Sequence, residues 1–258
     1  MCKRSPEKGA ISIPMHYKEH LSKDKKLKRL VEEQGLYELV KRDNLYFYLY
    51  CSIMSQQLSI KVAAVIRQRF LKLYDGREPT PEQILATPLE TLRSIGLSNA
   101  KTRYVHNVAS FAAEQRLEAN LLENMSNEDL IRHFTQIKGV GRWTSEMLLM
   151  FALRREDIFA LDDLGIQNAM KLLYRLDDSD RKQFREDMLR ISQKWSPYRT
   201  YACMYLWGWK DSRPPVEKPK TAKPGVQKLK KKQATASKKT LKKRKPVKAV
   251  SKSKKKKK

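Results

Sequence analysis

Two adjacent carboxylates, Asp162 and Asp163, stand between two predicted helices and are the residues of this chain best suited to chemistry. A carboxylate can stabilise positive charge that develops during a reaction, and it can orient or deprotonate an attacking water. Either aspartate could instead be the N-cap of the helix that follows. The two roles are compatible, because Asp162 can cap the helix while Asp163 points inward.

A glycine hairpin precedes this pair. The residues K-G-V-G at 138–141 separate a polar helix predicted over 126–134 from a second helix predicted over 142–153. Gly139 can take a left-handed conformation that ends the first helix, and Gly141 can let another backbone come close. The second helix then presents free N–H groups at its positive end, which suits a phosphate oxygen.

Two phrases in the sequence resemble one protein family. The first is I-K-G-V-G-R-W-T at 137–144, followed by an apolar helix and then D-D; the second is W-S-P-Y-R-T-Y-A-x-x-Y-L-W-x-W at 195–209. Together they resemble the helix-hairpin-helix superfamily of DNA base-excision glycosylases, and most closely its alkylated-base branch, 3-methyladenine DNA glycosylase II. The resemblance covers residues 44–209. It implies an all-α fold of two lobes, with a DNA cleft between them.

The resemblance also implies a reaction. Such an enzyme flips a nucleotide out of duplex DNA and hydrolyses the N-glycosidic bond of alkylated purines, chiefly 3-methyladenine and 7-methylguanine. The sugar gains oxocarbenium character, which a carboxylate stabilises. The family's acid falls on Asp163, which we therefore expect to be catalytic. Relatives that also cut the DNA backbone carry a Schiff-base lysine where this chain has Trp143, so we expect a monofunctional hydrolase that leaves an abasic site.

Five side chains are expected to line the base pocket. Alkylated purines carry positive charge, and an electron-rich ring attracts such a cation by roughly 0.5–2 kcal/mol. Trp143 and Trp207 fall on pocket positions of the family, although any of the aromatic residues could simply be core. Met147 stands where relatives have a tyrosine, which leaves the base preference open. The five residues are Trp143, Trp207, Met147, Tyr205 and Tyr46.

Two turns are expected to meet DNA as wedges. In the family, the loop after the apolar helix 44–54 carries an intercalating residue, which by position would be Gln57 or Leu58. The loop could instead be a plain helix junction. Leu97 is either a second intercalating residue or a hydrophobic staple for the next helix. Lys101 and Arg103 beyond it offer phosphate contacts.

The hairpin is expected to contact DNA and to hold an ion. The contacting residues would be Gly139, Val140, Gly141, Arg142 and Thr144. In the family, hairpin carbonyls hold a monovalent cation, Na⁺ or K⁺, and by position these are the backbone oxygens of Thr135, Ile137 and Val140. No iron–sulfur cluster or other cofactor is expected, because Cys2, Cys51 and Cys203 are widely separated.

Helical patterns run through the body of the chain, with almost no strand signal. Two short helices should follow capping boxes that begin at Thr80 and Thr87. The other predicted helices cover 22–33, 44–54, 60–73, 98–115, 164–174 and 178–195, with a last one starting at 197.

The net charge of +27 is unevenly spread. Residues 216–258 contain 20 Lys or Arg, one acid and no aromatic residue, so this segment cannot bury enough apolar surface to fold. We expect a flexible arm over 1–20, a glycosylase domain over 21–212 and a disordered polybasic tail over 213–258. The tail can contact phosphates but cannot read bases.

Composition also bounds the setting. The chain has no apolar run long enough to span a membrane, and its three cysteines fit a reducing compartment. We expect an intracellular, DNA-associated monomer, in a nucleoid or a nucleus, whose partner is double-stranded DNA with damaged bases. Two alternatives stay open: a glycosylase for oxidised or deaminated bases, and a non-enzymatic architectural protein. The latter has no use for Asp163 beside Trp143 and Trp207.

Overall fold

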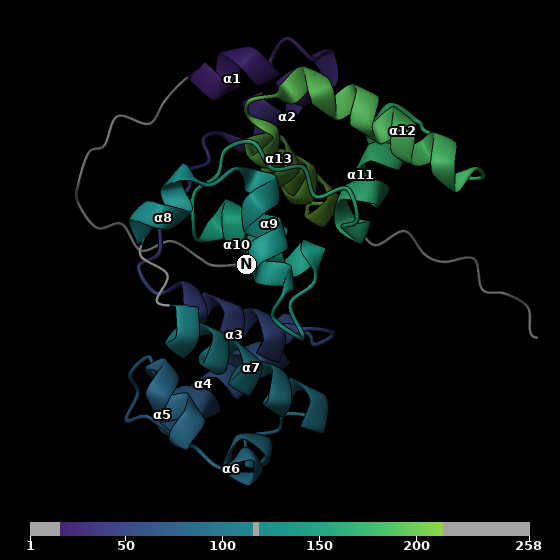
Figure 1. The fold of residues 1–258 in the computed structure, drawn as a ribbon. Coiled ribbons are helices and arrows are strands. Elements are labelled where there is room, and N and C mark those ends of the chain that lie inside the picture. The colour runs from purple at the N-terminus through teal and green to yellow at the C-terminus, as the bar shows by residue number, and fades with distance from the viewer. Residues whose placement is uncertain (1–15, 116–118, 214–258) are drawn as a thin grey trace, which may run out of the picture. The chain divides into compact units, whose positions relative to one another are not determined.

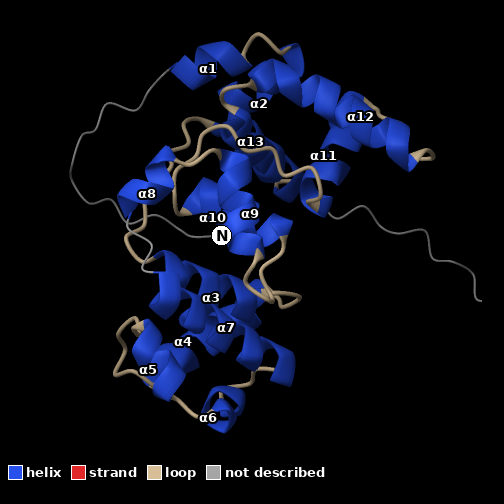
Figure 2. Cartoon of the chain, in the orientation of Figure 1, coloured by secondary structure: helices blue, strands red, loops and turns tan. Residues whose placement is uncertain are grey.

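A computed structural model of the chain describes residues 16–115 and 119–213. Every element in these residues is a helix, so the predicted all-α class is confirmed (Figures 1 and 2). None of the helices described there is long and apolar enough to cross a membrane. Residues 1–15 of the arm predicted over 1–20, and residues 214–258 of the tail predicted over 213–258, lie outside the described residues.

The helices form two groups that share one hydrophobic core. In one group, α7 packs against α3, α5 and α6, and α4 packs against α3; in the other, α13 packs against α2 and α11, and α9 against α10 (Figure 1). Contact between α3 and α10 joins the groups. The first group contains α3 (Leu45–Ser55), α4 (Ile60–Lys72), α5 (Pro81–Ala86), α6 (Leu89–Ser94) and α7 (Asn99–Gln115). The remaining helices are α1 (His16–Leu21), α2 (Lys25–Gln34), α8 (Ala119–Asn124), α9 (Asn127–Thr135), α10 (Arg142–Phe151), α11 (Leu164–Tyr174), α12 (Arg181–Ser192) with a 3₁₀ turn (Gln193–Trp195), and α13 (Arg199–Asp211).

The end of the predicted N-terminal arm is part of the body. Residues 16–21 form α1, and Tyr17 within it is fully buried. Its ring stacks on Tyr201 with centroids 3.9 Å apart, and its hydroxyl donates to the carbonyl of Tyr37 at 2.9 Å. The prediction of a loose arm over 16–20 is therefore wrong. A helix of six residues is too short to show apolar periodicity, and one aromatic ring anchors it.

One of the two predicted capping boxes forms. Thr80 Oγ1 accepts from the amide of Gln83 at 3.3 Å, and the Gln83 side chain accepts from the amide of Thr80 at 2.9 Å. The box predicted at Thr87 is wrong, since α6 starts after Pro88 without a side-chain cap. Thr87 Oγ1 instead donates to the carbonyl of Gln83 at 2.7 Å and lies 3.0 Å from the Tyr74 hydroxyl.

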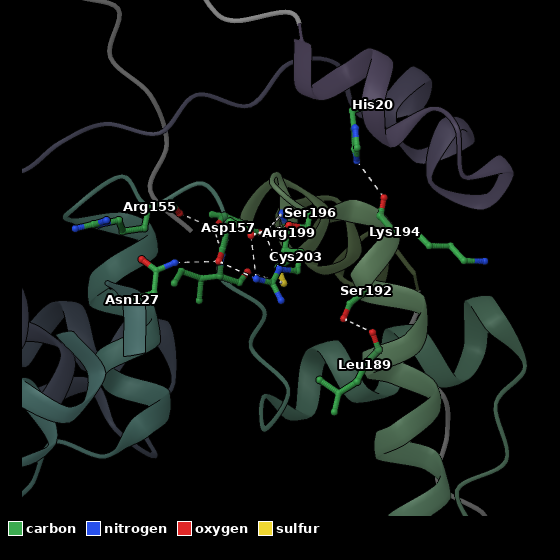
Figure 3. A network of polar contacts seen from close by, with 12 residues as sticks. His20, Asn127, Arg155, Asp157, Leu189, Ser192, Lys194, Ser196, Arg199 and Cys203 are labelled. Atoms are coloured by element: carbon green, nitrogen blue, oxygen red, sulfur yellow. Dashed lines mark hydrogen bonds and ion pairs between the residues drawn. The ribbon is translucent and has the colours of Figure 1, made fainter. Parts of the chain in front are cut away.

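The connection from α10 to α11 is tied to the start of α13 (Figure 3). Arg199 donates to the carboxylate of Asp157 from Nε at 2.6 Å and from Nη2 at 2.9 Å, and Ser196 Oγ donates to it at 2.8 Å. Burial alone would raise the pKa of Asp157, but the hydrogen bonds from Arg199 and Ser196 lower it. Asn127 of α9 donates to the Asp157 carbonyl at 3.2 Å. This network fixes the segment that carries the Asp162-Asp163 pair.

Candidate active site

Asp163 is the N-cap of α11. Its backbone is extended, with φ −73° and ψ 121°, and its Oδ1 accepts from the amide of Ile166 at 2.8 Å. The expectation that Asp162 caps this helix is wrong. Asp162 is exposed and forms an ion pair with Arg185 of α12. The two aspartates thus divide the roles differently from the prediction, because the inward-pointing residue also caps the helix.

Two indoles hold the Asp163 carboxylate. Trp207 Nε1 of α13 donates to Oδ1 at 2.8 Å, and Trp143 Nε1 of α10 donates to Oδ2 at 2.9 Å. Together with the Ile166 amide, the carboxylate receives N–H groups from three helices. Each carboxylate oxygen can accept about two hydrogen bonds, so Oδ1 is saturated while Oδ2 keeps one acceptor site. Sequence reasoning paired these residues by family position; the structure joins them by direct hydrogen bonds.

Gly165 makes room for this arrangement, and sequence reasoning missed it. A Cβ atom at Gly165 would lie 2.8 Å from Asp163 Oδ1 and 3.0 Å from Trp207 Nε1. The sequence offered a signal for Gly165, because glycine is unfavourable in a helix unless another group must approach the backbone closely. The sequence D-D-L-G therefore contains both the carboxylate and the space for its partner.

Accessible side chains surround the free acceptor site. Trp143 is 39 % exposed, and Leu164, which directly follows Asp163, is 70 % exposed. Trp207 is partly buried and packs against Phe151, with ring centroids 5.9 Å apart. The Trp143 side chain, which donates to Asp163, is thus accessible from solvent. Leu164 was not among the site residues predicted from the sequence. Only its exposure in the structure brings it to attention.

The other three residues predicted for the pocket differ in burial and contacts. Met147 lies one turn beyond Trp143 on the same face of α10 and is buried. Tyr46 packs, partly buried, against the core, so its role stays a prediction. Tyr205 is a core residue, which contradicts its expected place in the pocket: it is fully buried and donates to the carbonyl of Gly35 at 2.7 Å. Residues two apart on a helix face opposite ways, so Tyr205 cannot share the side of Trp207.

The hairpin between α9 and α10 is shaped by Gly139. Its φ of 108° is a conformation that L side chains rarely adopt, as predicted, and a Cβ there would lie 2.3 Å from the Tyr104 ring of α7. The close approach predicted at Gly141 is found at Gly139 instead. Gly141 N-caps α10 without a side chain, and its Cβ position has no neighbour within 4 Å. The first amides of α10 therefore have no side-chain cap.

The predicted side-chain contacts at the hairpin need correction. Val140 and Thr144 are buried, so only their backbone groups can meet DNA. Arg142 donates to Glu128 of α9 at 2.6 and 3.1 Å, and its Nε donates to Glu146 at 3.0 Å. Arg142 thus joins the two hairpin helices rather than presenting a free guanidinium. Burial raises the pKa of Glu146 to about 7, although Arg142 opposes the shift.

The turn between α3 and α4 is exposed, as expected for a wedge. Gln57 is exposed and has φ 57°, and Leu58 is 38 % exposed. A left-handed residue other than glycine costs about 1–2 kcal/mol, so this conformation is held by its surroundings. Lys101 of α7 holds it: its Nζ donates to the carbonyls of Met54 and Gln56 at 3.0 and 2.6 Å. Lys101 therefore caps α3 with two of its three donors, and its phosphate contact stays a prediction.

One face of α7 supports both surface turns. Lys101 fixes the Gln57 turn, Tyr104 packs under Gly139, and Asn107 Nδ2 donates to the carbonyl of Lys138 at 2.9 Å. These three residues recur every third position and so lie on neighbouring turns of one side. Leu97, before α7, is 5 % exposed and belongs to the core, which contradicts the intercalating role, while the staple stays a prediction.

Beside the hairpin, Arg103 and Lys138 line a hollow of about 180 Å³. The phosphate contact expected for Arg103 stays a prediction there. The carbonyls predicted to hold a cation belong to the same hairpin. The Ile137 oxygen accepts from the Val140 amide at 2.9 Å, which leaves its second lone pair, and carbonyl oxygens are suitable donors for Na⁺ or K⁺. In the part of the chain that the structure describes, no group of three His, Cys, Asp or Glu could hold a metal.

Comparison with known proteins gives a consistent result. Residues 50–194 match the model of the "HhH-GPD superfamily base excision DNA repair protein" family. The DNA-3-methyladenine glycosylase 1 of Schizosaccharomyces pombe is 38 % identical over 194 residues, which cover 73 % of this chain and 84 % of that protein. Two solved structures have TM-scores of 0.68. The DNA-3-methyladenine glycosidase of Bacillus halodurans is 33 % identical and covers 78 % of this chain and 91 % of its own. The S. pombe 3-methyladenine DNA glycosylase in complex with abasic DNA is 36 % identical and covers 76 % and 97 %. The predicted resemblance is confirmed.

Proposed function

We propose that this chain, which belongs to the HhH-GPD superfamily of base excision DNA repair proteins, is a DNA glycosylase that releases alkylated purines from duplex DNA. The expected substrates are chiefly 3-methyladenine and 7-methylguanine. The single observation that carries the proposal is the Asp163 carboxylate, which two indoles hold in place next to an accessible ring. A relative named for the same reaction supports it.

The reaction needs a charge stabiliser close to the sugar. A duplex hides the glycosidic bond, so the damaged nucleotide must leave the stack. When the bond breaks, positive charge develops at the sugar, and Asp163 Oδ2 retains an acceptor site with which it can stabilise that charge or orient a water. The N–H groups of Trp143 and Trp207 keep the carboxylate from turning during this step.

The substrate supplies part of the driving force. A purine alkylated at N3 or N7 carries positive charge, which weakens its bond to the sugar, so little general acid is required. The exposed face of Trp143 attracts such a cation by roughly 0.5–2 kcal/mol when the two stack. An undamaged purine lacks the charge and gains neither advantage. Charge on the base therefore determines selectivity at this site.

The protein is proposed to be monofunctional. A lyase needs an amine nucleophile at the sugar, and the residue at that position is Trp143, whose indole N–H is already donated to Asp163. Borohydride treatment of the enzyme with methylated duplex should trap no covalent adduct, and strand breaks should appear only after alkali. A borohydride-stable adduct at neutral pH would refute monofunctional hydrolysis without touching the substrate assignment.

Duplex DNA is proposed to bind at two turns and one ion. The uncapped amides of α10 receive a phosphate, and Gln57 or Leu58 fills the space left by the extruded base. The backbone oxygens of Thr135, Ile137 and Val140 would hold a monovalent cation at the hairpin, where it adds positive charge opposite the phosphate.

Base release tests the proposal. Duplex DNA treated with a methylating agent is incubated with the protein, and the free bases are separated and counted against an untreated duplex. We expect 3-methyladenine and 7-methylguanine in the soluble fraction. If the protein instead releases only deaminated or oxidised bases from matching duplexes, the substrate class is wrong. Tight binding with no base released from any duplex would mean that it is an architectural protein.

A further inference from the structure

A groove of about 430 Å³ lies between α2 and the C-terminal end of α11, and its walls are cationic. Lys25, Lys26 and Arg29 come from α2, Arg175 follows α11, and Leu173 supplies the apolar part. Lys25 and Arg29 are four residues apart, so they lie on the same side of α2. Four positive side chains thus converge on a space large enough for an anionic group.

The carboxylate closest in sequence, Asp24, keeps its negative charge, but its oxygens are bonded to neutral donors and not to the cations of the groove. Asp24 N-caps α2, and its Oδ1 accepts from the amides of Lys26 and Leu27 at 2.9 and 3.3 Å. Its Oδ2 accepts from the Tyr174 hydroxyl at 2.8 Å and from the Trp195 indole at 3.2 Å. All four acceptor sites of this carboxylate are occupied by donors within the protein.

The groove keeps a net positive charge, because its four cations outnumber Asp24 and the Glu33 that pairs with Arg29. Arg29 pairs with Glu33 at 3.2 Å, and Lys26 Nζ donates to the Leu173 carbonyl at 2.8 Å. Within residues 16–115 and 119–213, neither Lys25 nor Arg175 forms an ion pair, and both are exposed. The lysine bound to Leu173 holds α2 and α11 together, while the other cations face solvent.

Arg175 stands at a position that favours glycine. It ends α11 with φ 56° and ψ 45°, a left-handed conformation in which helices commonly place glycine. Strained non-glycine residues cluster where a side chain is needed for function. Arg154, which follows α10, is also exposed and left-handed, with φ 59°, but it does not line the groove. The two arginines form a matched pair.

We propose that this groove binds phosphates of DNA at a site separate from Asp163. The proposal rests on the proposed function, which makes DNA the partner. Helix α11 is 11 residues long, so the groove lies about 16 Å from Asp163 along the helix, a distance equal to about five base pairs of duplex. Guanidinium and ammonium groups are suited to phosphate oxygens. The groove would hold either the flank of the damaged duplex or a second DNA segment.

The test compares Arg175→Gly with Arg154→Gly. Both variants lose one positive charge and relieve the same backbone strain, so both should melt at or above the parental temperature. Affinity for an undamaged duplex is measured over a series of salt concentrations. Arg175→Gly should weaken binding several-fold at low salt and reduce the slope of log K against log salt by about 0.9, the value for one lost phosphate contact. Adding Lys25→Ala to Arg175→Gly should reduce this slope again, whereas Arg154→Gly should have the slope of the parent.

Two further arms identify the source of the phosphates. If the groove holds the flank of the same duplex, the difference between Arg175→Gly and the parent should vanish on duplexes that end within five base pairs of the lesion. If it holds a second segment, the difference should persist and appear as loss of a second bound duplex. Equal slopes for Arg175→Gly and Arg154→Gly overturn the proposal. The proposal is also overturned if Arg175→Gly binds polyglutamate more weakly than the parent but binds duplex equally well. That result would assign the groove to an acidic protein. Neither outcome depends on base release.

Discussion

The carboxylate site and the turn between α3 and α4 are built in opposite ways. Asp163 receives three N–H groups from three helices, and Gly165 leaves just the space that these contacts need. Gln57 and Leu58 project from the surface, and the main support given to them is Lys101, which binds the carbonyls beneath the turn. The difference indicates that the groups proposed for the chemistry are held in place without DNA, whereas the groups proposed to enter the duplex are exposed.

The largest effect is expected at the fixed site. Asp163→Asn keeps the size of the side chain and removes its charge, so oxocarbenium stabilisation is lost, and single-turnover base release should fall by about 10²-fold or more. DNA affinity should be retained. Asp162→Asn is the matched control and should stay near the parental rate, because Asp162 pairs with Arg185 at the surface. Release of 3-methyladenine by Asp163→Asn at the parental rate would remove this residue from the chemistry.

A smaller effect is expected from Gly165→Ala. The added methyl group would lie 2.8 Å from Asp163 Oδ1 and 3.0 Å from Trp207 Nε1, so the hydrogen bond between them must lengthen. A hydrogen bond to a charged group contributes roughly 1.5–3 kcal/mol, and its partial loss should slow base release by about 10-fold. Gly141→Ala, where nothing lies within 4 Å, controls for the substitution itself, and both variants are read at saturating enzyme because Gly141 belongs to the hairpin proposed to contact DNA. Unchanged release by Gly165→Ala would show that the carboxylate tolerates movement.

A weaker effect, on binding rather than on chemistry, is expected at the exposed turn. Lys101→Met leaves the carbonyls of Met54 and Gln56 without their donor, so the left-handed Gln57 should relax. We expect affinity for damaged duplex to fall several-fold, while base release at saturating enzyme stays within about 2-fold of the parent. Gln57→Ala should behave alike. A fall in the saturated rate would mean that the turn also positions the nucleotide for bond breaking.

The last effect concerns stability at the hairpin and not activity. The folded-state pKa of Glu146 is about 7, above its ordinary 4.5, so the folded state binds more protons between these values and stability falls as the pH rises through this window. Glu146→Gln should flatten that fall, by on the order of 2 kcal/mol between pH 4.5 and 8. Unfolding by urea at several pH values measures it. The exposed Glu128→Gln is the control, and identical pH curves for parent and Glu146→Gln would contradict the raised pKa.

Sequence reasoning recovered the parts of the molecule that have local signatures. The helix start at Thr80 was located because its capping box lies within four residues. Gly139 has the predicted positive φ, but α9 ends at Thr135, before the hairpin, so the prediction that Gly139 closes that helix is wrong. Residue types at family positions located Asp163, Trp143 and Trp207. What the sequence could not supply were contacts between different segments: Tyr205 with Gly35, and Arg142 with Glu128 of the preceding helix. A side chain's partner across the fold leaves no mark on its neighbours in sequence.

The central claim is that the Trp207 indole acts through the Asp163 carboxylate rather than on the base. A double-mutant cycle of Trp207→Phe and Asp163→Asn, read as single-turnover release of 3-methyladenine, tests this most directly. Trp207→Phe removes the N–H bonded at 2.8 Å and should slow the parent by about 10-fold, yet change nothing once Asp163 is asparagine. If Trp207→Phe slows both backgrounds by the same factor, the indole acts independently of the carboxylate, and the claim is contradicted.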